Sequence, residues 1–213
     1  METQAQDLIL CMETDFLTEG GQWYQDPLMA SLILPQLRTA GRLVGHPSED
    51  CASLAQFCNQ REGRMVRMVC GDTCGCTQTN SSAWYKVPAE GCQNACLARA
   101  YAQLAHKPCR DQADQAWFQF WDDYIDVSGA FVGQNLSASD MYPTIMQMTQ
   151  VLKATGCAGL YHPIIVGQWG ATYFCAGDPE RFRPLAWTCP ETCGCLAASP
   201  PSYCPASCSN STR

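Results

Sequence analysis

The sequence predicts a small disulfide-rich fold that is mostly α-helical, with irregular loops and little strand. The chain has 213 residues and 16 cysteines, an even number that is far above ordinary usage and typical of a disulfide framework. Apolar residues recur at helical spacing between proline and glycine boundaries, and no alternating run of β-branched residues indicates a sheet.

Four segments carry the helical pattern. The first, 28–39, follows Asp26-Pro27, a helix cap with proline at the first helical position. We expect it to stop at Gly41, and we expect Pro35 either to kink it or to shorten it. Three more helices are expected at 92–104, 111–132 and 142–155, the last of them ending at Gly156. In the second helix, Cys92 and Cys96 should share one face because they lie four residues apart.

The predicted helix 111–132 has two contrasting faces. An apolar stripe contains Trp117, Trp121, Tyr124, Ile125 and Ser128, and we interpret it as core packing rather than an exposed carbohydrate platform. The opposite face carries Asp122, Asp123 and Asp126. Calcium needs several carboxylate oxygens, but an Asx-rich loop with a central glycine is missing, so we interpret this face as solvated.

Charge and hydropathy narrow the classes of partner. The chain carries 13 basic and 20 acidic residues, for a net charge of −7. No basic stripe is present to contact phosphates, so we expect no nucleic-acid partner. No apolar run approaches the about 20 residues of a membrane-spanning helix, and we expect no transmembrane segment in this chain. The partner class that remains is a protein or a glycan ligand, whose identity is unknown.

The spacing of the cysteines favours disulfides over a metal site. Thiolate zinc sites and thioredoxin-like redox sites use CxxC pairs, which do not occur here, whereas C-x3-C and CxC spacings do. We therefore expect no metal site and no cofactor, and at least twelve bridged cysteines. The candidate disulfide residues are Cys51, Cys58, Cys70, Cys74, Cys76, Cys92, Cys96, Cys109, Cys157, Cys175, Cys189, Cys193 and Cys195.

An internal repeat organises the chain. Arg64 precedes Cys70-Gly-Asp-Thr-Cys-Gly-Cys76 by six positions, and Arg183 precedes Cys189-Pro-Glu-Thr-Cys-Gly-Cys195 in the same way, at a constant offset of 119 residues. The shared order of these arginine and cysteine positions indicates that one module was duplicated within the chain. The predicted division is a first cysteine-rich module (1–76), a helical insertion (77–141), a second module (142–195) and a Pro/Ser-rich linker or tail (196–213).

The two CxxTCGC clusters resemble the closing signature of ShK toxin-like (ShKT) modules. The clusters depart from this signature in two ways. One residue separates their last two cysteines, where the family generally has two, and each copy has five clustered cysteines, where the family has six. A sixth cysteine from elsewhere in the chain, such as Cys11 for the first unit, is therefore required. The resemblance implies the pairs Cys58–Cys74, Cys175–Cys193 and Cys51–Cys70, with Cys157 bonded to Cys189 or Cys195.

Two further expectations concern pairing and activity. Cysteines two residues apart, such as Cys74 and Cys76, should take different partners because pairing them strains the backbone, and Cys109 should close on Cys92 or Cys96. The family's channel blockers use a lysine between the middle cysteines. None lies at the equivalent positions here, and Arg64 and Arg183 are poor substitutes for its compact ammonium, which disfavours a toxin role.

The sequence favours a non-catalytic protein of an oxidising compartment. No GxSxG, HExxH or phosphate-binding loop is present, and the three histidines are isolated. Glycosylation sequons at Asn80, Asn135 and Asn210 agree with secretion, although residues 1–16 do not form a signal peptide, so we expect a mature chain or a segment of a longer protein. We predict an extracellular or lumenal binding or scaffold module, with two alternatives open: an accessory domain of, or a diverged, secreted enzyme, and a metal- or redox-handling protein.

Overall fold

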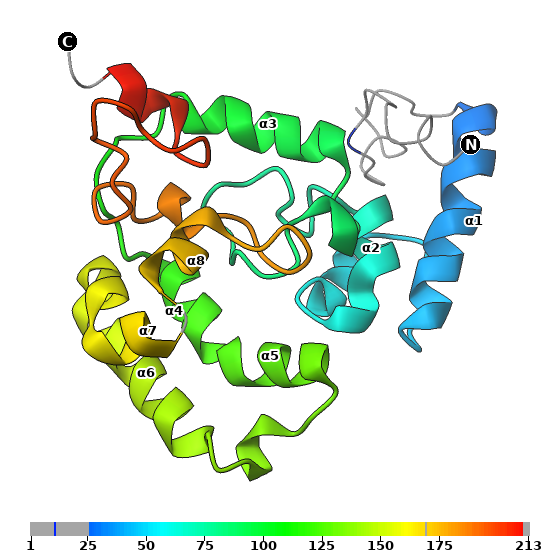
Figure 1. Ribbon diagram of the computed structural model, residues 1–213. Coiled ribbons are helices and arrows are strands. Elements are labelled where there is room, and N and C mark those ends of the chain that lie inside the picture. Colours follow the sequence, from blue (N-terminus) through cyan, green and yellow to red (C-terminus); the bar gives the residue numbers. More distant parts are fainter. Residues whose placement is uncertain (1–10, 12–25, 169, 211–213) are drawn as a thin grey trace. The chain divides into compact units, whose positions relative to one another are not determined.

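The computed structural model describes Cys11, residues 26–168 and residues 170–210. Within these ranges the chain is mostly helical and has no strand beyond isolated bridges such as Trp84–Phe182, which confirms the predicted fold class. The described residues form eight α-helices, which carry labels in Figure 1. They are α1 (Pro27–Leu43), α2 (Arg64–Val69), α3 (Asn94–Leu104), α4 (Gln115–Asp122), α5 (Tyr124–Val132), α6 (Tyr142–Thr155), α7 (Pro163–Gln168) and α8 (Ala171–Ala176).

The chain divides into two compact units. Unit 1 comprises 1–78 and 85–100, and unit 2 comprises 79–84 and 101–213. The segment 77–141, predicted as an insertion, is therefore shared between the two units. The segment 196–213, predicted as a linker or tail, contributes two bonded cysteines to unit 2, Cys204 and Cys208.

Unit 1 is organised by α1, which packs against α2 (Figure 1). Asp26 caps α1 by accepting hydrogen bonds from the backbone N–H groups of Leu28 and Met29, at 2.9 and 3.2 Å, as its Asp-Pro start predicts. The expected stop at Gly41 is wrong, because α1 continues to Leu43. A Cβ at Gly41 would lie only 2.6 Å from the carbonyl oxygen of His46, so this glycine permits a close backbone approach.

Unit 2 contains two helices where one was expected. The segment 111–132 breaks at Asp123, whose ψ of −11° departs from the helical value of about −42°, and aspartate is a poor residue inside a helix because its side chain competes for backbone groups. The expected helix over 142–155 is present as α6. Trp117 Nε1 donates to the carbonyl of Leu152 at 3.1 Å and so joins α4 to α6.

The core of unit 2 is aromatic. Trp84 stacks on Phe120 with ring centroids 4.4 Å apart, and its Nε1 donates to the carbonyl of Phe120 at 2.8 Å. Phe182 meets both rings edge to face. Trp117 and Trp121 are each 1% exposed, so the prediction that they pack in the core is confirmed.

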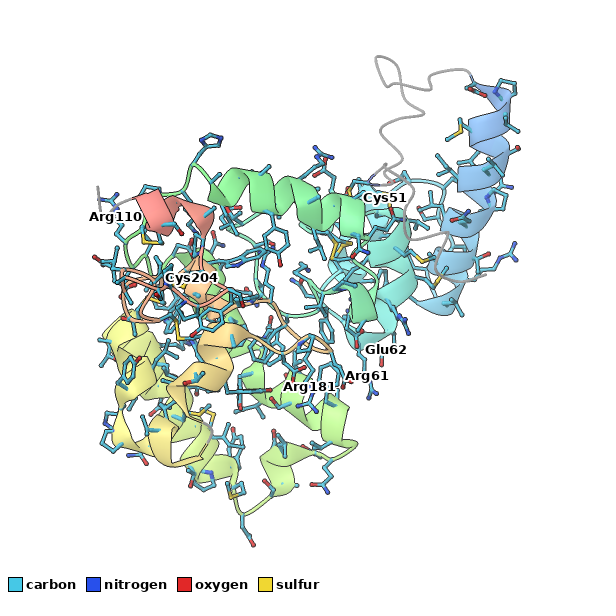
Figure 2. The ribbon with its side chains drawn as sticks, turned by 45° about the horizontal axis from the view of Figure 1, so that its top comes forward. Cys51, Arg61, Glu62, Arg110, Arg181 and Cys204 are labelled. Carbon is cyan, nitrogen blue, oxygen red and sulfur yellow. A yellow bond between two sulfur atoms is a disulfide. The ribbon has the colours of Figure 1, made fainter. Side chains whose placement is uncertain are left out.

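All sixteen cysteines are paired, in eight disulfides (yellow bonds in Figure 2). The pairs implied by the ShKT resemblance are present, and Cys157 bonds to Cys189. The expectation for Cys109 is wrong, because Cys109 bonds to Cys208 within unit 2, while Cys92 and Cys96 find partners in unit 1. The eight disulfides are Cys11–Cys96, Cys51–Cys70, Cys58–Cys74, Cys76–Cys92, Cys109–Cys208, Cys157–Cys189, Cys175–Cys193 and Cys195–Cys204.

The pairing is the same in both units when cysteines are numbered in chain order. In each set of eight, the first bonds to the eighth, the second to the fourth, the third to the fifth and the sixth to the seventh. The turns that close the clusters also match, because Gly75 and Gly194 take positive φ angles of 74° and 76°, a conformation that glycine adopts without steric cost. Cys76 N–H donates to the carbonyl of Gly71 and Cys195 N–H to that of Pro190, both at 2.8 Å.

Candidate functional site

Unit 2 contains a pocket of about 270 Å³ built on α5. One face of this helix supplies four lining residues at helical spacing. Ile145 comes from α6 and Tyr173 from α8, and the other four, Trp84 among them, come from segments outside the α-helices. The lining residues are Trp84, Tyr124, Ser128, Phe131, Val132, Leu136, Met141, Ile145, Tyr173 and Arg181.

The inner wall of the pocket is formed by buried apolar side chains. Trp84, Tyr124 and Ile145 are 2%, 5% and 4% exposed. Trp84 is held by its stacking on Phe120 and by the hydrogen bond from its indole nitrogen, and Tyr124 lies 5.9 Å from it, centroid to centroid. Val132 and Met141, in contrast, are 53% and 43% exposed, so apolar side chains continue from the inner wall to the surface.

A small set of hydrogen-bonded polar residues borders the apolar wall. Tyr173 Oη donates to Asp178 Oδ2 at 3.0 Å, and the Glu180 N–H donates to Asp178 Oδ1 at 2.9 Å. Arg181 Nε lies 3.7 Å from the same carboxylate, and its guanidinium carbon lies 5.0 Å from the centroid of the Phe131 ring. Arg181, labelled in Figure 2, is the charged residue of the pocket lining.

The two tyrosines of the pocket remain neutral hydroxyl groups near neutral pH. Burial, together with the neighbouring Asp178 carboxylate, raises the pKa of Tyr173 to about 12. Burial also raises the pKa of Tyr124 above its ordinary value. Desolvation disfavours the phenolate in both cases. The pocket therefore offers neutral aromatic surface together with one cationic side chain.

A second feature of unit 2 is a pair of buried cations outside the pocket. Arg183 Nη2 donates to the carbonyl and the hydroxyl of Ser81 at 2.6 and 2.7 Å, and its guanidinium carbon lies 5.1 Å from the Trp187 ring centroid. Burial lowers the pKa of Arg183 to about 9. Lys107 Nζ is also buried, without a hydrogen-bond partner among the described residues, and burial lowers its pKa. Asp114 raises the pKa of both groups.

The repeat alignment of Arg64 with Arg183 does not extend to their surroundings. Arg183 is 4% exposed, whereas Arg64 is exposed on α2. The buried arginine of unit 1 is Arg67, which is 0% exposed and lies 4.7 Å from the Tyr85 ring centroid. Arginine spacing alone could not distinguish the two, because only the packing of α2 decides which side chain turns inward.

The other sequence-predicted groups lie apart from the pocket or on its margin. Asn80 and Asn135 are exposed, and the side chain of Asn210 lies outside the described residues. Asp122 forms an ion pair with Lys153, and Asp123 accepts a hydrogen bond from Gln119. In the described part of the chain, no three His, Cys, Asp or Glu side chains are grouped so as to hold a metal ion.

Sequence reasoning missed the pocket, although part of its signal was present. Tyr124 and Ser128 belong to the apolar stripe that was interpreted as core, but the break at Asp123 separates them from Trp117 and Trp121. Periodicity identifies an apolar helical face and cannot tell whether that face meets another element or an open cavity.

Comparisons of the chain with models of known protein families, with curated proteins and with solved structures found no match. Within the described ranges, none of the helices is long and apolar enough to span a membrane.

Proposed function

We propose that this protein is a non-catalytic, disulfide-stabilised binding module of an extracellular or lumenal space, and that it binds the apolar part of a ligand in the pocket of unit 2. The observation that carries the proposal is the pocket itself, whose inner wall is formed by the buried side chains of Trp84, Tyr124 and Ile145, with the Trp84 indole held by a hydrogen bond. Ligand sites in proteins are typically preformed apolar cavities with a few polar groups.

The disulfide frame supports the proposed compartment. Eight disulfides account for all sixteen cysteines, and such bonds persist in oxidising surroundings and are rare where thiols are kept reduced. The same frame favours binding, because cross-links that restrict the chain keep a pocket in its binding shape before the ligand arrives.

The protonation and the hydrogen bonds of the polar groups in the pocket favour ligand binding over catalysis. Raised pKa values keep the pocket tyrosines protonated near neutral pH. The Asp178 carboxylate already accepts two hydrogen bonds, from Tyr173 and from the Glu180 backbone. These groups hold the wall in place and give it polarity, which is the role of polar groups in a ligand pocket.

The common pairing order supports the further proposal that the chain carries two diverged copies of one cysteine-rich module similar to ShKT modules. The pairs Cys51–Cys70 and Cys58–Cys74 recur as Cys157–Cys189 and Cys175–Cys193. Each copy extends beyond its ShKT-like cluster, because it also has two outer disulfides. These are Cys11–Cys96 and Cys76–Cys92 in unit 1, and Cys109–Cys208 and Cys195–Cys204 in unit 2.

Titration calorimetry with octan-1-ol, a neutral apolar probe, tests the binding function. We expect saturable binding at one site. Val132→Glu should weaken it at least tenfold, because a bound apolar chain would displace water from the new carboxylate without offering it a hydrogen bond. Val166→Glu on α7 is the matched control, since Val166 is 50% exposed and does not line the pocket. Absence of binding, or an equal effect of the two substitutions, would exclude this pocket as the binding site.

A further inference from the structure

We infer that the ligand of this pocket is an amphipathic carboxylate, with its apolar body among the aromatic rings and its acid group on Arg181. This inference rests on the proposed binding function. Of the ten lining residues, Arg181 is the one with a formal charge, and its guanidinium lies at the edge of the apolar surface, over the Phe131 ring.

The guanidinium of Arg181 is placed to bind an additional acid group. Its salt bridge to Asp178 runs through Nε, and its side chain also interacts with that of Tyr173, which leaves further N–H groups of the five that a guanidinium carries. Arginine presents its N–H groups in a planar fork that matches the two oxygens of a carboxylate. The side chain is 38% exposed, and a ligand can therefore reach it from solvent.

Asp178 is not a close ion-pair partner of Arg181. Its contact with Arg181 Nε is 3.7 Å, beyond ordinary hydrogen-bond length, whereas its bonds from Tyr173 Oη and the Glu180 N–H are 3.0 and 2.9 Å. Asp178 is thus held mainly by two neutral donors. The cation–π contact with Phe131 helps to hold the guanidinium at the pocket, which limits the conformational freedom that Arg181 loses when an acid group binds.

The size of the pocket limits the apolar body of the ligand. Its volume of about 270 Å³ lies just below the range of about 300–1,000 Å³ that is usual for small-molecule sites. A short alkyl chain or a small ring system fits this volume. The whole chain has a net charge of −7, which repels anions at long range, so any preference for a carboxylate must come from Arg181.

The test compares octanoate with octan-1-ol at pH 8 by titration calorimetry, on the wild type, Arg181→Met, Arg181→Lys and Arg110→Met. Methionine preserves much of the length and apolar surface of arginine but removes its charge. Arg110, labelled in Figure 2, is an exposed arginine of unit 2 that does not line the pocket, and its substitution is the matched control.

We expect the wild type and Arg110→Met to bind octanoate about tenfold more tightly than octan-1-ol, as one charge-assisted pair allows. Arg181→Met should lose this preference and bind octan-1-ol unchanged, and Arg181→Lys should retain part of it. If octan-1-ol binds but octanoate is not preferred, or if the preference survives in Arg181→Met, the acid group is not recognised by Arg181, although the pocket still binds. If octan-1-ol does not bind the wild type, the proposed function fails as well.

Discussion

Arg67 Nε donates a hydrogen bond of 2.6 Å to the backbone carbonyl of Glu90, a residue 23 positions later in the chain. Arg67 Nη1 donates to the carbonyls of Cys58 and Gln60 at 2.9 and 2.6 Å. One fully buried guanidinium thereby joins three segments of unit 1 beside the disulfides Cys58–Cys74 and Cys76–Cys92. Burial lowers the pKa of Arg67 to about 10, and it remains charged near neutral pH.

Replacing Arg67 with methionine should destabilise unit 1. The carbonyl groups of Cys58 and Glu90 would lose the donor that Arg67 supplies, and the partly buried Glu90 carboxylate would lose its ion pair, at a cost of about 3 kcal/mol. Urea unfolding under non-reducing conditions measures this. Arg64→Met is the matched control, because Arg64 is exposed on the same helix and should change the free energy of unfolding by less than about 0.5 kcal/mol. Equal effects would show that the hydrogen bonds of Arg67 do not stabilise the unit.

The two outer disulfides of unit 2 should differ in their contribution to stability. Cys109–Cys208 spans 99 residues and Cys195–Cys204 spans 9. Restriction of the unfolded chain predicts contributions of about 4.7 and about 2.6 kcal/mol. The double variant Cys109→Ala/Cys208→Ala should therefore be about 2 kcal/mol less stable than Cys195→Ala/Cys204→Ala. Chemical unfolding of both variants, with the remaining disulfides verified by peptide mapping, decides this, and the reverse order would contradict it.

Lys107 should make stability depend on pH in the alkaline range. Its pKa is lowered in the folded protein, mainly by burial, so between the folded value and the unfolded value of 10.5 the unfolded chain binds more protons. The free energy of unfolding contributed by this group therefore rises with pH across that interval. Lys107→Met should be more stable than the wild type near pH 7, and the difference should shrink as the pH approaches 10.5.

Lys153→Met is the control for this pH dependence, because Lys153 is a partly exposed lysine paired with Asp122. Its difference from the wild type should stay within about 0.5 kcal/mol across the same pH range. Thermal unfolding at several pH values measures both variants. A difference between Lys107→Met and the wild type that does not change with pH would contradict the expected titration.

Passage through a eukaryotic secretory pathway should place glycans on Asn80 and Asn135. Both side chains are exposed, and Asn135 uses its oxygen to accept a hydrogen bond from the Ser137 N–H, which does not engage the amide nitrogen that carries a glycan. Intact mass before and after enzymatic deglycosylation, on the wild type and on Asn80→Gln and Asn135→Gln, measures the occupancy of each site. An unchanged mass in the secreted wild type would contradict the prediction.

Sequence and structure agree where the determinants are local. The Asp26-Pro27 start of α1 and the Gly156 end of α6 depend on backbone groups within one turn, so the residues at those positions are sufficient to predict them. The different partners of Cys74 and Cys76 follow in the same way, from the strain of bonding cysteines two residues apart.

Agreement is lost where the outcome depends on distant packing. The partner of Cys109 was misassigned because Cys92 and Cys96 are near it in sequence, whereas Cys208 is 99 residues away, and many connectivities are compatible with sixteen cysteines. The break at Asp123 and the burial of Arg67 rather than Arg64 depend in the same way on which side chains of other segments face each helix.

By itself, then, the sequence determined the helical, disulfide-rich class, the cap of α1 and the paired CxxTCGC clusters, because residue type and short spacing suffice for these features. Only the tertiary structure decided the common order of the eight disulfides and the placing of Arg181 beside rings from α5 and α8. The physical reason is that a pocket is a property of the space between elements. Its volume and its single charge depend on side chains that are brought together from positions 84 to 181.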